Sequence, residues 1–186
     1  MPFHHGQTSV DPIAHFMQEH DHVLQQLSAL ARATRSLAED GFTEEAFRRV
    51  ERAVSFINEE VHTHNKSEEE ALFPVLDRYV EGPTRYMREE HTLLRKEYVR
   101  LRKAAAAVRD HREDAAATGN LAEASQSMVH LLVNHIHKEN HILFPLVRKF
   151  LTKDALREVA RRIVHGRVEG QPRLRKTPRK QQRRRK

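Results

Sequence analysis

The chain has 186 residues, a formal net charge of +7, no cysteine, and only six glycines and seven prolines. This length suits one domain with a tail, and the missing cysteine excludes disulfides, thiolate zinc sites and iron–sulfur clusters. Long stretches rich in Ala, Leu, Glu, Arg and Lys predict an all-α fold. Because we find neither a signal-peptide pattern nor an apolar run of membrane-spanning length, we expect a cytoplasmic protein with no membrane partner.

The positive charge belongs to one end of the chain. Residues 171–186 hold nine basic residues and no acidic ones, whereas the rest of the chain has 24 basic residues against 26 acidic ones. This composition predicts a basic disordered tail. Such a tail is either a solubilising end or an electrostatic contact for nucleic acid or an acidic partner. It has no aromatic residue, so base stacking is not expected.

The first two helices have clear start signals. Residues 1–10 show no helical pattern and are expected to form a flexible arm. Asp11-Pro12 combines an N-cap with an N1 proline, which opens a helix that ends at Gly41. Thr43 is the expected N-cap of the second helix, whose apolar residues repeat every three or four positions. Because proline lacks an N–H, this helix should kink or end near Pro74.

The second half repeats this layout. Gly82-Pro83 leads into a third helix, and a turn around Thr118-Gly119-Asn120 is expected to precede the fourth, with Asn120 as its N-cap. Pro145 repeats the break at Pro74. Thr152 is the expected N-cap of a shorter helix that ends before Gly166. The buried seam of the fourth helix is expected to hold Met128, Leu132, His135, Glu139 and Ile142.

Four long helices with short connections predict an antiparallel up-down-up-down four-helix bundle over residues 11–150. Residues 151–166 are expected to form an additional short C-terminal helix that covers an end or flank of the bundle. Residues 167–186 would then be the basic tail.

A His-x3-Glu sequence occurs twice, as His64 with Glu68 and as His135 with Glu139, and each copy stands four residues ahead of Leu-Phe-Pro. The two copies are 71 residues apart. On an α-helix, residues four apart are offset by about 40° and share one face, so each pair can bind one centre. The repeat predicts approximate two-fold symmetry.

The same 71-residue offset relates His20 to His91, and both lie on apolar helix stripes. A lone histidine in a core is commonly a hydrogen-bonded structural residue, but here four are in register and two are followed by an acid. Burying two carboxylates without partners costs several kcal/mol each, and a cation removes that cost. The pattern therefore predicts a dinuclear metal site. Its expected ligands are His20, His64, Glu68, His91, His135 and Glu139.

Imidazole and carboxylate ligands without thiolate suit iron, manganese or zinc. Ferritin-like di-iron bundles use Glu-x-x-His with extra glutamates, a different order and ratio. The neighbouring acids Glu69 and Glu70 are expected to face solvent or to support the ligands.

These six residues, with the two Leu-Phe-Pro sequences, resemble the hemerythrin-like domain, or HHE cation-binding domain, of the bacterial type. The resemblance covers about residues 11–150. It implies a four-helix bundle around two iron ions joined by an oxo or hydroxo bridge, with Glu68 and Glu139 as bridging ligands. The implied histidine pairs, one for each iron, are His20 with His64 and His91 with His135.

The chain departs from the oxygen-carrying members, which have a fifth histidine in a His-x3-His pair on the third helix. The positions four residues either side of His91 are Met87 and Arg95. Both irons are therefore expected to have room for an exogenous ligand or for a further protein oxygen. The candidates for that oxygen are Glu60, Tyr86 and Tyr98.

We therefore expect a di-iron protein that binds or turns over a small oxidant or gas (O2, H2O2 or NO) and has a role in oxidative stress. Catalase-like peroxide decomposition, or sensing of O2, NO or iron, is expected ahead of reversible oxygen carriage. The alternative is a nucleic-acid-associated protein that binds through residues 171–186, with a regulatory or structural metal. A two-metal hydrolase is a weaker alternative, because no additional base can be identified.

Overall fold

The computed structural model describes the backbone of residues 11–170 and the side chains of residues 11–166. The expected arm at residues 1–10 and the basic segment 171–186 lie outside this range. Within it, all regular elements are helical. No helix in the described range combines the length and apolar character that crossing a membrane requires.

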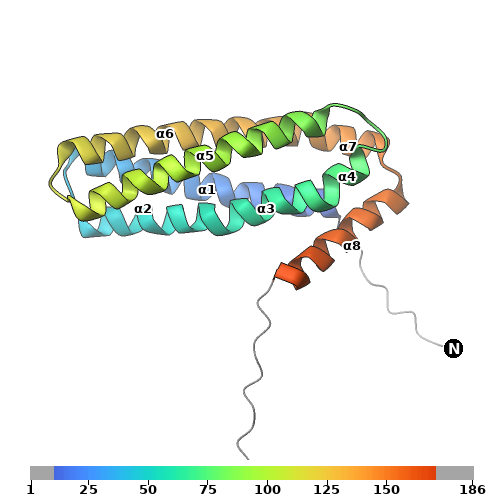
Figure 1. Cartoon of the computed structure of the whole chain (residues 1–186), viewed down its shortest axis with the longest axis horizontal. Helices are drawn as coiled ribbons and strands as arrows, with labels where there is room; N and C mark the ends of the chain where they lie inside the picture. Colours follow the sequence, from blue (N-terminus) through green and yellow to red (C-terminus); the bar gives the residue numbers. More distant parts are fainter. Residues whose placement is uncertain (1–10, 171–186) are drawn as a thin grey trace, which may run out of the picture.

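The chain forms four long rods, and each runs antiparallel to the rod before it (Figure 1). The first rod is α1 (Pro12–Glu39), and the third is α5 (Pro83–Asp110). The second rod consists of α2 (Glu44–Phe56), the π-helical turn η1 (Ile57–Val61), α3 (His62–Ser67), the π-helical turn η2 (Glu68–Leu72) and α4 (Phe73–Leu76). The fourth rod consists of α6 (Ala115–Lys138), the π-helical turn η3 (Glu139–Leu143) and α7 (Phe144–Phe150). Because α1 packs against α2 and α6, and α5 packs against α6 and α2, the rods close into a four-helix bundle, as predicted.

Local capping explains where the first two rods begin. The Asp11 side chain accepts a hydrogen bond from the backbone N–H of Ile13 at 3.0 Å, with Pro12 at the first helical position. Thr43 accepts one from the N–H of Ala46 at 3.2 Å. Both N-caps confirm the sequence prediction, and each satisfies a backbone donor that the helix cannot.

The fourth rod begins earlier than predicted. Helix α6 begins at Ala115, and the Asp114 side chain accepts a hydrogen bond from the N–H of Ala116 at 2.8 Å. The predicted turn and N-cap at Asn120 are therefore wrong. Consecutive alanines favour the helix more than the following Gly119 opposes it, because a glycine inside a helix costs only about 1 kcal/mol.

Helix α8 (Lys153–Gly170) follows the bundle and crosses one of its ends (Figure 1). Thr152 caps it as predicted, because its hydroxyl accepts from the N–H of Ala155 at 3.2 Å. The helix nevertheless runs through Gly166 instead of ending before it, because a glycine inside a helix costs only about 1 kcal/mol.

The second rod ends near Pro74, at Leu76, as predicted, whereas the fourth rod continues past Pro145 to Phe150. Pro74 and Pro145 each follow a π-helical turn, and these turns begin at Glu68 and Glu139. Proline has no backbone N–H to donate to the preceding turn. A π-helical turn contains one extra residue, and this local change of hydrogen bonding lets the rod tolerate the missing donor. The extra residue also changes which side chains point inward. Ile142, predicted to be buried, is 55 % exposed, and Leu143 is fully buried instead.

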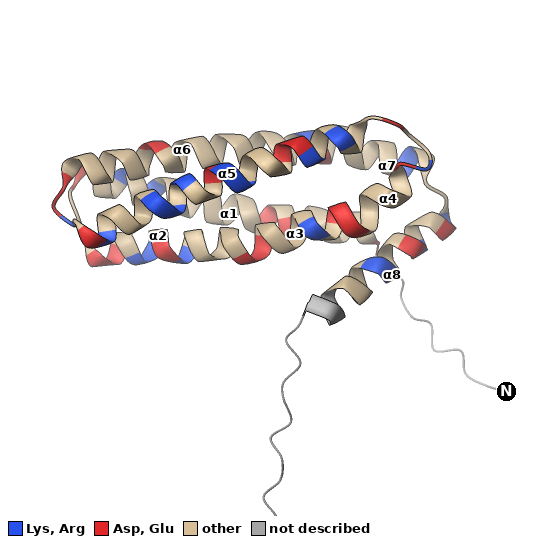
Figure 2. Ribbon diagram, viewed as in Figure 1, with Lys and Arg blue, Asp and Glu red and all other residues tan. Residues whose placement is uncertain are grey.

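Two apolar clusters fill the interior and leave a polar layer between them. The large core takes its residues from Val23–Leu37 of α1 and from 46–61, 94–108 and 117–136. The small core lies at the other end, and it takes its residues from Ile13, Phe16, 71–76, Met87, 143–151 and, in α8, 155–163. Charged residues of both signs alternate on the outside of α2 and α5 (Figure 2).

Candidate metal centre

The six predicted ligands come from all four rods and meet in the layer between the two cores. Each is no more than 5 % exposed. The two histidines of the first and third rods face the two His-x3-Glu pairs of the second and fourth. In order along the chain, they lie on α1 (His20), α3 and η2 (His64 and Glu68), α5 (His91), and α6 and η3 (His135 and Glu139).

Their nitrogen and oxygen atoms form two groups that could each hold a metal ion. Within each group, all ligand atoms lie within 4.8 Å of one another. Both groups contain Glu68 and Glu139. The histidines divide between them as His20 with His64 in one group and His91 with His135 in the other.

Glu139 lies between the two histidine pairs. Its Oε2 is 3.1 Å from Nε2 of His20, and its Oε1 is 3.1 Å from Nε2 of His135. Glu68 is also placed between the pairs, with Oε2 at 3.6 Å from Nε2 of His64 and 3.5 Å from Nε2 of His91. Each carboxylate is therefore close to imidazoles of both groups.

The outer nitrogen of every ligand imidazole has an oxygen partner. These oxygens belong to acidic or amide side chains, so the imidazole Nδ1 carries the hydrogen and donates it, which leaves the Nε2 lone pair directed into the centre. The pairs are His20 with Asn140 (2.8 Å), His64 with Glu19 (2.9 Å), His91 with Glu69 (2.7 Å) and His135 with Glu90 (3.0 Å).

Sequence reasoning did not assign these partners to their histidines, although the repeat contains the signal. Glu19 and Glu90 are related by the 71-residue offset, and so are Glu69 and Asn140. The same is true of the aromatic residue in each Leu-Phe-Pro sequence. Phe144 stacks on His20 with ring centroids 5.5 Å apart, and Phe73 stacks on His91 at 5.8 Å.

The inward-facing nitrogen and carboxylate oxygen atoms crowd against one another. Nε2 of His20 lies 3.0 Å from Nε2 of His64, and the corresponding distance between His91 and His135 is 3.1 Å. In the described part of the chain, none of the four carboxylate oxygens of Glu68 and Glu139 accepts a hydrogen bond. Lone pairs and carboxylates gathered in a buried space repel one another, and a metal cation would satisfy them all. The residues therefore fit a metal centre.

The same crowding changes the acidities of these groups. Burial and the charge of Glu139 raise the pKa of the Glu68 carboxyl well above its ordinary value. Burial also acts to raise the pKa of Glu139, but the imidazoles around it, His135 first, outweigh burial and hold that pKa well below its ordinary value. Burial lowers the pKa of His64. At His135 burial is outweighed by Glu139 and Glu90, which raise the pKa to about 9. In the metal-free protein, protons held by Glu68 and His135 thus offset part of the negative charge that a metal cation would otherwise balance.

Glu60, one of the candidates for a further ligand, lies outside both groups of ligand atoms in the described residues. Tyr86 is 49 % exposed, and Tyr98 packs against the large core. Glu60 is exposed on the second rod. Met87, at one of the positions where a fifth histidine was considered, belongs to the small core. Arg95, at the other, points to Glu69 at 3.3 Å.

A helical bundle that buries four imidazoles around two shared carboxylates defines a metal-binding protein of the four-helix-bundle class. The sequence model of the Hemerythrin HHE cation binding domain matches residues 11–147, and the chain belongs to this family. The resemblance noted from the ligand motifs is thereby confirmed. No curated relative matches the chain at a significant level.

Proposed function

We propose that this centre holds two iron ions and that the protein binds or turns over a small oxidant or gas. The observation that supports this proposal is the sharing of Glu68 and Glu139 by two groups of ligand atoms. Shared carboxylates hold two cations close together, and two adjacent redox metals supply electron-transfer chemistry toward O2, H2O2 or NO when bound. Membership of the hemerythrin family makes iron the expected metal.

The ligand set supports reaction with an exogenous molecule. Each group offers two imidazoles and the two shared carboxylates, which leaves coordination positions for a small molecule. Neither Met87 nor Arg95 supplies the additional imidazole that would close one of the two metals. With both metals open, we infer peroxide decomposition or sensing of O2, NO or iron ahead of reversible oxygen carriage.

A pocket of about 310 Å³, lined in part by the apolar side chains of Val23 and Phe56, reaches one ligand from outside. Its lining includes His64 together with Glu19, His22 and Glu60. The residues that the 71-residue offset relates to His22 and Glu60 are Leu93 and Leu131, so this polar lining is particular to the α1 and second-rod side. A small polar molecule can approach the centre from that side.

Metal analysis and optical spectroscopy test the proposal. Protein purified in air should contain two iron ions per chain, and its absorption spectrum should change on addition of peroxide. The reduced protein should oxidise in air within minutes to a stable diferric form. A variant with both His20→Gln and His91→Gln should show none of these changes. A long-lived oxygen adduct that is released when the oxygen pressure falls would overturn the proposal in favour of oxygen carriage.

The alternative function, nucleic-acid binding through residues 171–186, depends on a segment outside the described residues. Neither the fold nor the family match favours it, and we do not propose it.

A further inference from the structure

The centre obeys the internal repeat at every ligand but departs from it at one supporting residue. Glu19 accepts from Nδ1 of His64, and its repeat partner Glu90 accepts from Nδ1 of His135. By the same offset, Glu69 behind His91 corresponds to Asn140 behind His20. One histidine pair is thus supported by two carboxylates, and the other by one carboxylate and one amide.

The difference is a difference in charge at hydrogen-bond distance. Glu69 lies 2.7 Å from Nδ1 of His91, while the amide oxygen of Asn140 lies 2.8 Å from Nδ1 of His20, so the geometry is alike. A carboxylate that accepts the Nδ1 hydrogen increases the electron density at Nε2 and strengthens its bond to a metal. An amide oxygen is only a dipole and does this less.

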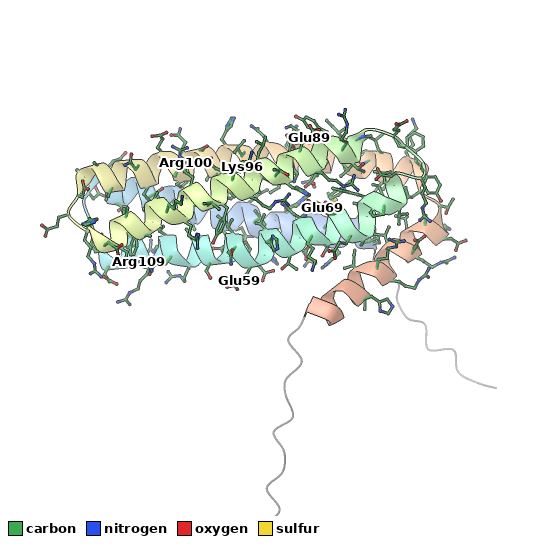
Figure 3. All side chains as sticks on the ribbon, viewed as in Figure 1. Glu59, Glu69, Glu89, Lys96, Arg100 and Arg109 are labelled. Atoms are coloured by element: carbon green, nitrogen blue, oxygen red, sulfur yellow. The ribbon has the colours of Figure 1, made fainter. Side chains whose placement is uncertain are left out.

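Neighbouring cations orient the carboxylates without removing the difference. Glu69 reaches from the second rod toward α5 (Figure 3), where Arg95 contacts it at 3.3 Å. Glu90 is contacted by Lys138. Both cations lie on the solvent side of the carboxylate, with the side chain of Arg95 47 % exposed and that of Lys138 30 % exposed, where water and salt screen them. The hydrogen bonds to the imidazoles are direct and partly buried.

We propose that the two metal positions are inequivalent and that the His91/His135 position fills first, with Glu69 and Asn140 as the positioning residues that set the order. This inference rests on the dinuclear centre proposed above. Changes in residues that support metal-binding histidines alter metal affinity by roughly 10- to 100-fold, and we expect the two dissociation constants to differ by about 10-fold or more.

Titration of the metal-free full-length chain with Co²⁺, followed by calorimetry and visible absorption, tests the order. The wild type should bind two ions in two resolved steps. His91→Gln should remove the tighter step and leave the weaker one, whereas His20→Gln should remove the weaker step. Loss of the tighter step in His20→Gln instead would overturn the assignment.

Two further variants test the supporting residues themselves. Glu69→Asn gives both halves the same supporting residues and should weaken the first step by roughly 10- to 100-fold, so that the two steps merge. Asn140→Asp adds a carboxylate to the weaker half and should tighten the second step, which keeps the inference testable if Glu69→Asn does not fold. Glu89→Gln replaces an exposed acid on α5 (Figure 3); it is the control for loss of one negative charge and should change neither step.

The outcomes separate this inference from the proposed function. Two ions bound with equal affinity, or a Glu69→Asn titration identical to that of the wild type, would overturn the order but leave the dinuclear centre standing. A wild-type stoichiometry of one ion would overturn the dinuclear centre and this inference with it.

Discussion

Helix α1 contributes to two very different interiors within a few turns. From Val23 to Leu37 its buried side chains are apolar except Thr34, whose hydroxyl lies 3.0 Å from the Leu30 carbonyl oxygen and 3.1 Å from the Ser125 hydroxyl. One turn before Val23 it contributes His20 to the metal centre. The large core thus satisfies its buried polar groups with protein atoms, whereas Glu68 and Glu139 of the centre are left without hydrogen bonds.

The two regions have opposite effects on the stability of the metal-free fold. Burial of apolar side chains in the large core stabilises the bundle whether or not a metal is bound. The metal centre opposes folding until a cation arrives, because unpartnered buried carboxylates and facing lone pairs cost free energy. The same four helices can hold both only because the stable region is the larger one.

The largest expected effect comes from removing a shared carboxylate. Glu139→Ala in the metal-loaded protein should release more than one ion per chain, because Glu139 contacts both histidine pairs. The free energy of unfolding should fall with the lost metal, by about 4 kcal/mol per ion when free metal exceeds Kd a thousandfold. Metal analysis and urea unfolding with and without a chelator measure this. A variant that keeps one ion at full occupancy would show that Glu139 serves a single metal.

A substitution in the large core should lower the free energy of unfolding slightly less than Glu139→Ala does, and this effect should not depend on metal. Leu101 is fully buried on α5, and Leu101→Ala should lower the free energy of unfolding by about 2–5 kcal/mol, equally with and without metal. Leu93→Ala on the same helix is the control, since Leu93 is 51 % exposed and its loss should change stability by less than about 0.5 kcal/mol. If Leu101→Ala lowered the free energy of unfolding more with metal bound than without it, the large core and the metal centre would be energetically coupled, contrary to this prediction.

The effect of Glu68→Gln on the free energy of unfolding should have opposite signs in the metal-free and the metal-bound protein. The pKa of Glu68 is raised, so its ionised form opposes folding, and the contribution of Glu68 to the stability of the metal-free wild type falls as pH rises from about 4.5 through the folded-state pKa. A neutral amide removes that cost, and we expect the metal-free variant to be more stable than the wild type by roughly 1–3 kcal/mol at neutral pH. In the presence of metal it should be less stable. Urea unfolding at pH 4 and pH 7 checks both signs, and destabilisation in the metal-free state would contradict the prediction.

The smallest effect concerns a residue that supports a ligand. Burial acts to raise the pKa of Glu90, but His135 and Lys138 outweigh it and lower the pKa from 4.5 to about 2. Glu90 therefore stabilises the fold above pH 4.5, and this contribution is lost as pH falls toward 2. Glu90→Gln should lower the stability of the metal-free protein by about 1 kcal/mol at pH 7. The difference from the wild type, measured by urea unfolding at pH 7 and pH 3, should shrink at the lower pH, whereas the control Glu89→Gln should show little change at either.

The helices and the candidate ligands could be predicted from local patterns. Apolar residues at intervals of three and four define the rods, Asp11 and Thr43 mark two of their starts, and the 71-residue repeat identifies the six residues that the fold brings together. These features are readable because helix periodicity and capping depend on residues within a turn or two of each other. The family resemblance rests on the same residues.

Other features depend on the packing of all four rods. The π-helical turns at Glu68 and Glu139 shift the register by one residue, which buries Leu143 in place of Ile142. A one-residue shift leaves no local signal, because it is stable only when the carboxylate inside and the apolar residue after it find their places against other rods. The partners of the histidines are of the same kind. Asn140 supports His20 across 120 positions of the chain, and only the folded bundle brings their atoms together.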